Sequence, residues 1–331
     1  MDRERTEVIF GATSRIAREY IDFLVNIRQV PMLLFSRSGS REDFSDSKLV
    51  LGHVQHDFAS DDWSDVVYAL RKVKNPRFVY LATRNNAKTR VDSPGSTRAQ
   101  YNQVNVDPLH KIISLAKEKG SDLIYTSTDL VYGGEGEGFS ETDIPKHPWG
   151  YYGHSKREGE IVALDYERGV IIRLAKVEGM RGDFLSGIAH ELHKQKKVSE
   201  SDRKKVEVWD NVENRCVGIN DVCYVIDKTA SYSGLGRVFH VASPDEPVSR
   251  YKLAYDFVNS INQAQLDLNL PIELLTPSQH DFRDSRPRRL RLETRLTELS
   301  LYYHPTPIMG GLRDKISHGY PYLRSNDPSI Y

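Results

Sequence analysis

Short apolar runs alternate with longer amphipathic stretches through the first half of this chain. The runs are rich in branched and aromatic residues and end at polar or glycine positions, which is typical of buried strands. The expected strands are Glu7–Phe10, Pro31–Phe35, the residues around Val54, Phe78–Ala82, Leu123–Ser127 and Val170–Leu174. Apolar positions recur at helical spacing in Ser14–Ile27, Asp62–Val73, Thr97–Lys119 (before Gly120) and Tyr152–Tyr166.

This alternation predicts an α/β fold class, a doubly wound parallel sheet (Rossmann) with helices on both faces. The pattern loosens after about residue 176. We therefore expect residues 1–175 to form the sheet domain and residues 176–331 to form mainly a smaller substrate-binding region. A segment near residues 218–242 is expected to return to the sheet, because Arg237–Val241 looks like another buried strand.

Composition narrows the classes of ligand. Lys+Arg and Asp+Glu both number 46, so no net field favours nucleic acid or an anionic membrane, and a polyanionic ligand needs local positive charge. The charged start of the chain and the absence of any long apolar run predict a cytoplasmic protein with no membrane partner. Cys216 and Cys223 have no zinc-type spacing, so no metal is expected.

The turn between the first strand and helix, Gly11 to Ala17, has the small residues that a dinucleotide fold needs. Gly11 allows a tight turn, and Ser14 can cap the helix whose amino end would face a pyrophosphate. An ordinary strand-to-helix turn is the alternative. After the second strand, Ser36-Arg37 offers no acid for a ribose hydroxyl but an arginine that suits a 2′-phosphate, which favours NADP unless Arg37 is a solvated loop residue.

Tyr152 and Lys156 lie four residues apart, one turn along the same helical face. A neighbouring ammonium is expected to lower the pKa of the phenol, which could then exchange a proton with a carbonyl or alcohol oxygen. The same spacing is common on surface helices. Upstream, Tyr125–Gly133 brings hydroxyl residues to the carboxyl end of a central strand, where ligands bind in doubly wound sheets.

Taken together, these segments resemble the extended short-chain dehydrogenases/reductases, and within them the dTDP-4-dehydrorhamnose reductase group. The resemblance spans about residues 6–300 and is strongest at 123–175. The similar segments are Ser127–Tyr132, Glu141-Thr142-Asp143, Pro145, Pro148, Tyr152–Lys156, Gly159-Glu160, Asn105 with its neighbours, and Arg286–Thr294.

The resemblance implies a role for each matching residue. Thr128 would orient the substrate oxygen, Tyr152 would donate the proton, and Lys156 would tune Tyr152 and bind the nicotinamide ribose. The implied cofactor contacts are Gly11, Thr13, Ser14, Arg15 and Ile16 (pyrophosphate), Ser36 and Arg37 (adenosine ribose), Asp57 and Phe58 (adenine), Leu81, Ala82 and Thr83 (middle of the cofactor), and Asn105. The implied substrate contacts are Thr128, Asp129, Lys176, Glu178 and Arg286.

The chain departs from the group at two of these positions. Lys176 and Glu178 stand where the group has aromatic residues lining the sugar pocket, which favours a more polar sugar unless the two side chains pair on the surface. The implied function is NADPH-dependent reduction of a keto group on a nucleotide-activated sugar. NAD is the alternative cofactor. The alternatives are an epimerase or dehydratase with tightly bound NAD, and a cofactor-binding regulatory subunit. A homodimer stays open, and no nucleic-acid partner is expected.

Overall fold

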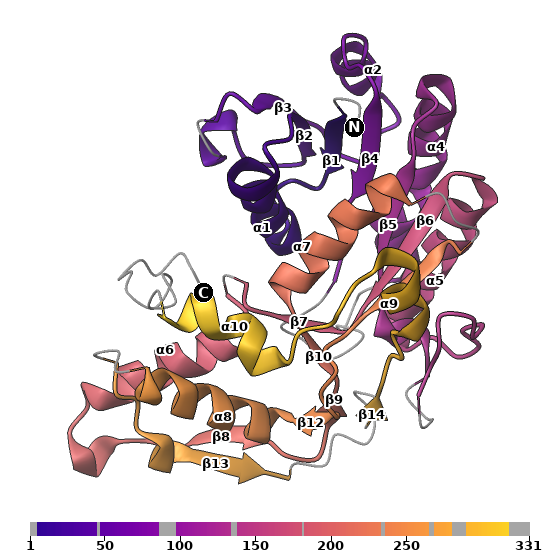
Figure 1. Ribbon diagram of the computed structural model, residues 1–331. Coiled ribbons are helices and arrows are strands. Elements are labelled where there is room, and N and C mark those ends of the chain that lie inside the picture. Colours follow the sequence, from indigo (N-terminus) through magenta and orange to yellow (C-terminus); the bar gives the residue numbers. More distant parts are fainter. Residues whose placement is uncertain are drawn as a thin grey trace.

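A parallel sheet of seven strands forms the centre of the molecule (Figure 1). The computed structural model describes residues 5–44, 47–85, 97–133, 138–180, 182–232, 236–264, 268–279 and 289–317. Across the sheet the strands are β11 (Val238–Val241), β6 (Gly169–Leu174), β5 (Leu123–Thr128), β4 (Pro76–Tyr80), β1 (Thr6–Phe10), β2 (Met32–Ser36) and β3 (Val50–Gln55). Every neighbouring pair is parallel, so the predicted doubly wound fold is confirmed.

Helices cover both faces of this sheet, as the buried side chains show. On one face α1 (Arg15–Phe23) and α7 (Ile219–Lys228) pack against a core that includes Ile9 and Leu34. On the other face α2 (Ser64–Leu70), α4 (Asp107–Lys119) and α5 (Gly150–Asp165) pack against a core that includes Val8 and Phe10. Neighbouring residues of one strand thus enter opposite cores, which explains why the strands are apolar throughout.

Two helices differ from their predicted bounds. The helix expected over Ser14–Ile27 is α1 followed by a π-helical turn, Leu24–Arg28. The single helix expected over Thr97–Lys119 is broken at Val106 into α3 (Arg98–Asn105) and α4. Pro108 has no N–H with which to continue the helical ladder, and the Tyr80 hydroxyl donates to the Val104 carbonyl that the ladder would have used.

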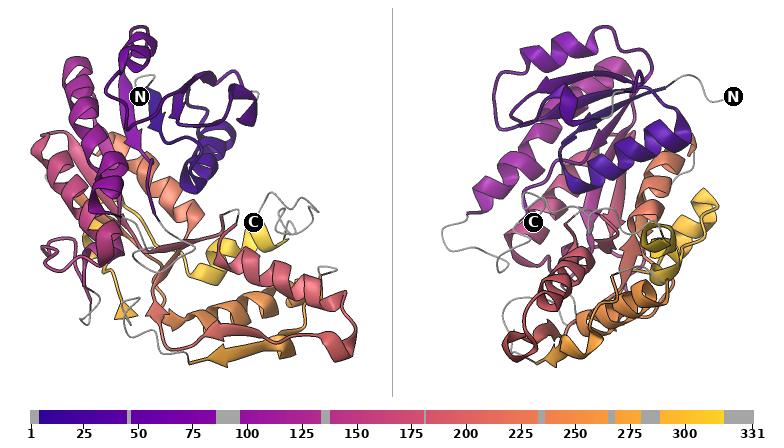
Figure 2. Two further views of the ribbon diagram at one scale, coloured as in Figure 1. Left: turned by 180° about the vertical axis from the view of Figure 1, so that it is seen from behind. Right: turned by 90° about the vertical axis from the view of Figure 1, so that its left-hand side faces the viewer.

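A lobe below the sheet has a core of its own (Figures 1 and 2). Its helices are α6 (Phe184–Lys196), α8 (Arg250–Gln263) and α10 (Ile308–Ser317), and its longest strands are the pair β8 (Val206–Trp209) and β13 (Leu275–Ser278). The short strands are β7 (Lys176–Glu178), β10 (Cys216–Gly218), β9 (Glu213–Asn214), β12 (Val248–Ser249) and β14 (Arg289–Leu290), and α9 (Arg295–Leu301) precedes α10. Because β7 follows β6 after one residue, the lobe begins at the carboxyl edge of the sheet.

Candidate functional site

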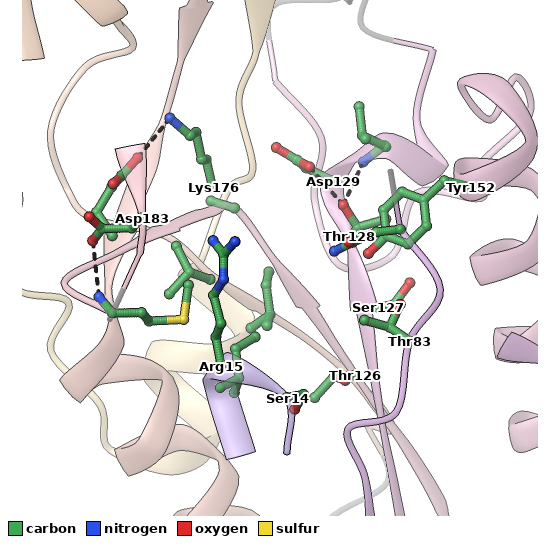
Figure 3. Close-up of a pocket in the computed structure, with 18 of the residues that line it drawn as sticks. Ser14, Arg15, Thr83, Thr126, Ser127, Thr128, Asp129, Tyr152, Lys176 and Asp183 are labelled. Atoms are coloured by element: carbon green, nitrogen blue, oxygen red, sulfur yellow. Dashed lines mark hydrogen bonds and ion pairs between the residues drawn. The ribbon is translucent and has the colours of Figure 1, made fainter. Parts of the chain in front are cut away.

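A cavity of about 750 Å³ lies between the carboxyl edge of the sheet and the lobe. The amino end of α1, the ends of β4, β5 and β6, helix α5 and the lobe all contribute to its wall. Figure 3 shows Tyr152 and Thr128 on one side, Lys176 and Asp183 on the other, and Ser14 and Arg15 at the base between them. The predicted residues that line this cavity are Thr13, Ser14, Arg15, Ile16, Leu81, Thr83, Thr128, Asp129, Tyr152, Lys156, Lys176 and Glu178.

The base of the cavity is the turn that leads into α1. Gly11 has a φ of +89°, and a Cβ atom there would lie 2.3 Å from the backbone nitrogen of Ala82, so only glycine fits. The Ser14 hydroxyl accepts a hydrogen bond from the Ala17 amide at 3.3 Å, which is the predicted helix cap. The first-turn amides of an α-helix have no acceptor within the helix, so this end of α1 fits a pyrophosphate.

Tyr152 lies on α5 with its phenol in the cavity wall (Figure 3). Burial raises the pKa of Tyr152 to about 12, and the carboxylate of Asp129 adds to the increase. The hydroxyl groups of Thr83 and Thr128 offset part of it by hydrogen bonding. The expectation that Lys156 lowers the pKa of this phenol is therefore wrong for the free protein, because desolvation outweighs the favourable neighbours.

Lys156 is buried one turn along α5, with 1% of its side chain exposed. Its ammonium lies 4.0 Å from the centre of the Tyr125 ring. Burial lowers the pKa of Lys156 to about 7, although the neighbouring Glu160 carboxylate acts in the opposite direction. A lysine with this pKa gains and loses a proton near neutral pH, which is unusual for an ammonium and suits proton exchange.

Thr128 ends β5, and the Thr128 hydroxyl donates to the Asp129 carboxylate at 3.0 Å and accepts from the Leu130 amide at 3.3 Å. These bonds fix the Thr128 hydroxyl at the edge of the sheet, close to the Tyr152 phenol (Figure 3). Burial also raises the pKa of Asp129 to about 6. Two weak acids, one phenol and one carboxyl, therefore border the same part of the cavity.

Asn105 lies behind the cavity rather than in its lining. Its fully buried amide donates to the Ser155 hydroxyl at 2.8 Å and to the Arg84 carbonyl at 3.2 Å, and it accepts from the Arg84 amide at 2.9 Å. It also lies 3.4 Å from the Thr83 hydroxyl. Asn105 therefore joins α3 to α5 and to the end of β4, and its side chain has no surface left for a cofactor.

Lys176 and Glu178 form an ion pair of 2.7 Å in the lobe side of the cavity wall. Glu178 is fully buried, whereas 23% of the Lys176 side chain is exposed. Burial raises the pKa of Glu178, and the Lys176 ammonium limits the increase. The two residues thus pair with each other, but in the cavity and not on the outer surface.

The other predicted cofactor residues lie outside this cavity lining. Arg37 is exposed at the end of β2, where Gly39 of the same loop lies beside Thr13. Ser36 is buried, and its hydroxyl donates to the Ser38 carbonyl. Asp57 is exposed, Phe58 packs in the core, and Ala82 touches the α1 turn. Arg286 lies outside the described residues.

Several lobe residues line the cavity without having been expected, among them Asp183, Phe184 and Arg250. Asp183 caps α6 by accepting from the Ser186 amide at 2.8 Å, a role that its place before a helix indicates. Nothing in the local pattern places Phe184 or Arg250 at the cavity, since long-range packing of the lobe does so. Among the described residues no group of three metal-ligating side chains occurs, and no helix is long and apolar enough to cross a membrane.

Comparison with known proteins gives the family. The model of the RmlD substrate-binding domain matches residues 44–319. This chain belongs to that family. It is 28% identical over 222 residues (63% of the chain) to the methionine adenosyltransferase 2 subunit beta of Danio rerio. It is also 28% identical over 160 residues (46% of the chain) to the dTDP-4-dehydrorhamnose reductase of Aggregatibacter actinomycetemcomitans. The chain spans 64% and 53% of the lengths of these two relatives.

Solved structures give the same fold at lower identity. The dTDP-4-dehydrorhamnose reductase of Bacillus anthracis, solved with NADP, has a TM-score of 0.74 and 17% identity over 96% of this chain and 100% of that one. The dTDP-glucose 4,6-dehydratase of the same organism, solved with NAD, has a TM-score of 0.74 and 14% identity over 98% and 97%. The predicted relation to the extended short-chain dehydrogenases/reductases is confirmed.

Proposed function

We propose that this protein is an NADPH-dependent reductase that reduces a keto group on a nucleotide-activated sugar. The observation that carries the proposal is the arrangement of Thr128, Tyr152 and Lys156 in one cavity with the amino end of α1. The family match and the reductase among its relatives agree with it. When bound, the cofactor supplies the hydride, and the chain supplies the proton and the positioning.

The protonation state of Tyr152 suits reduction. A phenol with a pKa of about 12 carries its proton at neutral pH, so Tyr152 can donate it to the oxygen of a carbonyl as negative charge develops there. Thr128 holds a hydroxyl beside the same phenol, and it would orient the substrate oxygen by turning its O–H from Asp129 to that oxygen. Lys156, with a pKa of about 7 and one turn along α5, would restore the proton and stabilise the phenolate that remains.

The cofactor would lie across the base of the cavity. The first turn of α1, from Ser14 to Ile16, would hold the pyrophosphate, and Lys156 would reach the nicotinamide ribose. Arg37, exposed in the loop after β2 whose Gly39 lies beside this turn, would meet the 2′-phosphate of NADPH. The NADP complex of the Bacillus anthracis reductase supports this choice, although related dehydratase structures hold NAD.

Substituting the proton donor tests the proposal. Tyr152→Phe should lower kcat on a 4-keto nucleotide sugar by about 10²–10⁴-fold while NADPH affinity stays within about twofold, because only the hydroxyl is lost. Tyr151→Phe is the matched control, since Tyr151 is the adjacent tyrosine on α5 and does not line the cavity. Wild-type turnover by Tyr152→Phe would show that this phenol is not the acid.

A regulatory subunit is the second candidate function, because one relative is by name a subunit of methionine adenosyltransferase. Such a subunit would bind NADPH without turning over any nucleotide sugar. A panel of 4-keto nucleotide sugars with purified wild-type protein separates the two, with NADPH oxidation followed by absorbance. An epimerase or dehydratase would instead copurify with oxidised NAD and return the hydride to the same sugar.

A further inference from the structure

Arg250 is the first residue of α8, and its side chain lines the cavity from the lobe. The guanidinium carbon lies 5.0 Å from the centre of the Phe184 ring and 5.3 Å from that of Trp209. The backbone below is fixed, because Ser249 caps α8 and donates its hydroxyl to Asp210 at 2.5 Å. Two aromatic rings and a capped helix therefore hold the Arg250 side chain at the cavity wall.

The Arg250 guanidinium forms no direct ion pair with any of the described acids. Within the described part of the chain, no carboxylate lies within ion-pair distance of the guanidinium, and its buried Nε has no hydrogen-bond partner. A guanidinium has five N–H donors, and a half-buried charge whose donors lack acceptors is unfavourable. Burial lowers the pKa of Arg250, and the Glu178 carboxylate acts in the opposite direction.

The acids on this side of the cavity already have partners. Glu178 pairs with Lys176 at 2.7 Å. The Asp183 carboxylate accepts from the Gly179, Met180 and Ser186 amides at 2.5, 3.0 and 2.8 Å. The charges of Lys176, Glu178, Asp183 and Arg250 thus sum to zero, but both carboxylates already accept from other groups, and the Arg250 Nε is left without an acceptor among the described residues.

The buried Arg215, near the lobe, shows the difference. Arg215 donates to the Asp245 carbonyl at 3.0 Å and to the Leu292 carbonyl at 2.6 Å, so its donors serve the fold. Arg250 has no such bonds among the described residues and faces the cavity instead. Its planar fork of donors matches the oxygens of a phosphate or a carboxylate.

We propose that Arg250 binds an oxyanion of the substrate and so fixes the substrate against the lobe, an inference that rests on the proposed function. The oxyanion comes either from the diphosphate of the nucleotide or from a carboxylate on the sugar. Either oxyanion would supply the acceptors that the guanidinium donors lack. The residue is a substrate-binding residue and takes no part in proton transfer.

Calorimetric titration of the NADPH-loaded protein tests this with pyrophosphate, UDP, dTDP, UDP-glucose, UDP-glucuronic acid and uridine. Arg250→Gln should weaken binding of the relevant oxyanion by about 10- to 100-fold, the effect of one charge-assisted contact, while Arg250→Lys restores part of it. Lys252→Gln is the matched control. It removes a positive charge two residues further along α8, where Lys252 pairs with Asp256 at 2.5 Å. Uridine, which has no phosphate, should bind all variants alike.

The outcomes distinguish a nucleotide diphosphate from a sugar carboxylate as the source of the oxyanion. They also distinguish the Arg250 site from the proposed reductase function. Weaker pyrophosphate, UDP and dTDP binding assigns Arg250 to the diphosphate, and weaker UDP-glucuronic acid binding alone assigns it to a sugar carboxylate. Unchanged affinities, or an equal loss for uridine with a lower Tm, overturn the inference while the proposed function stands. Arg250-dependent pyrophosphate binding without any nucleotide binding supports the oxyanion site and counts against the proposed function. A wild-type protein that binds none of the six overturns both.

Discussion

At the scale of single residues, Lys156 shows a conflict between stability and chemistry. Its ammonium is buried against the Tyr125 ring, and the Glu160 carboxylate one turn away does not compensate for the loss of water. A lysine with only a structural role would add no stability at this position. The cost is understandable if the role of Lys156 is to exchange a proton with Tyr152 near neutral pH.

The pKa of Lys156 predicts how stability depends on pH. In the folded protein its pKa is about 7 and the ordinary value is 10.5, so between these values the unfolded chain holds more protons and the free energy of unfolding rises with pH. Below pH 7 both states are protonated and the burial cost is fully present. Lys156→Met, which removes this cost, should be more stable than wild type by about 5 kcal/mol at pH 6, and the difference should shrink towards pH 10.

Urea unfolding at pH 6, 8 and 10 measures this difference, and the same variant should be inactive. Lys111→Met, at an exposed position on α4, is the control and should show no such dependence on pH. A Lys156→Met protein that is less stable than wild type at pH 6 would mean that the ammonium is stabilised where it lies.

The predicted preference for NADPH over NADH depends on a single residue, Arg37. The side chain is exposed at the end of β2, free to meet a 2′-phosphate beside the α1 turn. Arg37→Ala should weaken NADPH binding by about 10- to 100-fold and leave NADH binding unchanged, since one charge-assisted contact is lost. Fluorescence titration with both cofactors checks this. Wild-type protein that binds NADH as tightly as NADPH would make Arg37 an ordinary loop residue.

At the scale of elements, the strands could be predicted from the sequence and the helix break could not. Strand positions follow from local apolar runs that are buried on both faces. The break at Val106 depends on distant partners, because the Tyr80 hydroxyl bonds the Val104 carbonyl and the Tyr125 hydroxyl bonds the Asn105 carbonyl at 2.9 Å. These two tyrosines come from β4 and β5, so no local pattern around Pro108 shows where the helix is interrupted.

A buried ionic cluster joins four elements at the opposite edge of the sheet. Glu7 on β1 accepts from Arg77 on β4 at 2.9 Å, and Arg77 also donates to Tyr20 on α1 at 2.8 Å and to the Ile226 carbonyl of α7 at 2.8 Å. Arg5 adds a second ion pair to Glu7 at 2.7 Å. Removing the Glu7 charge takes away the ion pair of Arg77, whereas Arg5 keeps its ion pair with the buried Asp227.

Glu7→Gln should therefore lower the free energy of unfolding by about 3–5 kcal/mol, the usual cost of breaking a buried ion pair on one side. The exposed pair of Arg168 and Asp122, at 2.8 Å with 45% and 39% of the side chains accessible, provides the control. Asp122→Asn should cost less than about 1 kcal/mol. Urea unfolding measures both variants. Equal losses in the free energy of unfolding for Glu7→Gln and Asp122→Asn would contradict this prediction, which depends on their difference in burial.

At the scale of the whole molecule, the two walls of the cavity differ in how far the sequence predicts them. Thr128, Tyr152 and Lys156 lie on the sheet and on α5, where motif and element coincide. Phe184 and Arg250 reach the cavity through the packing of the lobe, in which some strands have only two residues and leave no periodic pattern. Their position depends on contacts between distant segments, which composition and spacing do not contain.

The same lobe wall leads to a prediction about the substrate. Lys176 and Glu178 place an ion pair in the cavity wall where the family resemblance implies two aromatic residues. An aromatic wall favours the apolar face of a deoxysugar, whereas an ion pair offers hydrogen bonds to hydroxyl, amino or carboxyl groups. We therefore expect wild type to prefer a polar nucleotide sugar to a dTDP-4-keto-6-deoxyhexose.

Lys176→Trp should reverse this preference by about 10- to 100-fold in the ratio of kcat/KM values, since a contact with a polar group is exchanged for an apolar surface. Because the single change leaves the fully buried Glu178 without its cation, the double variant Lys176→Trp, Glu178→Tyr is the better-folded form of the same test. Steady-state kinetics with both sugars and both variants give the comparison. If wild type prefers the deoxysugar and neither variant changes the ratio, the ion pair does not contact the sugar, and the lobe wall selects the substrate through other residues.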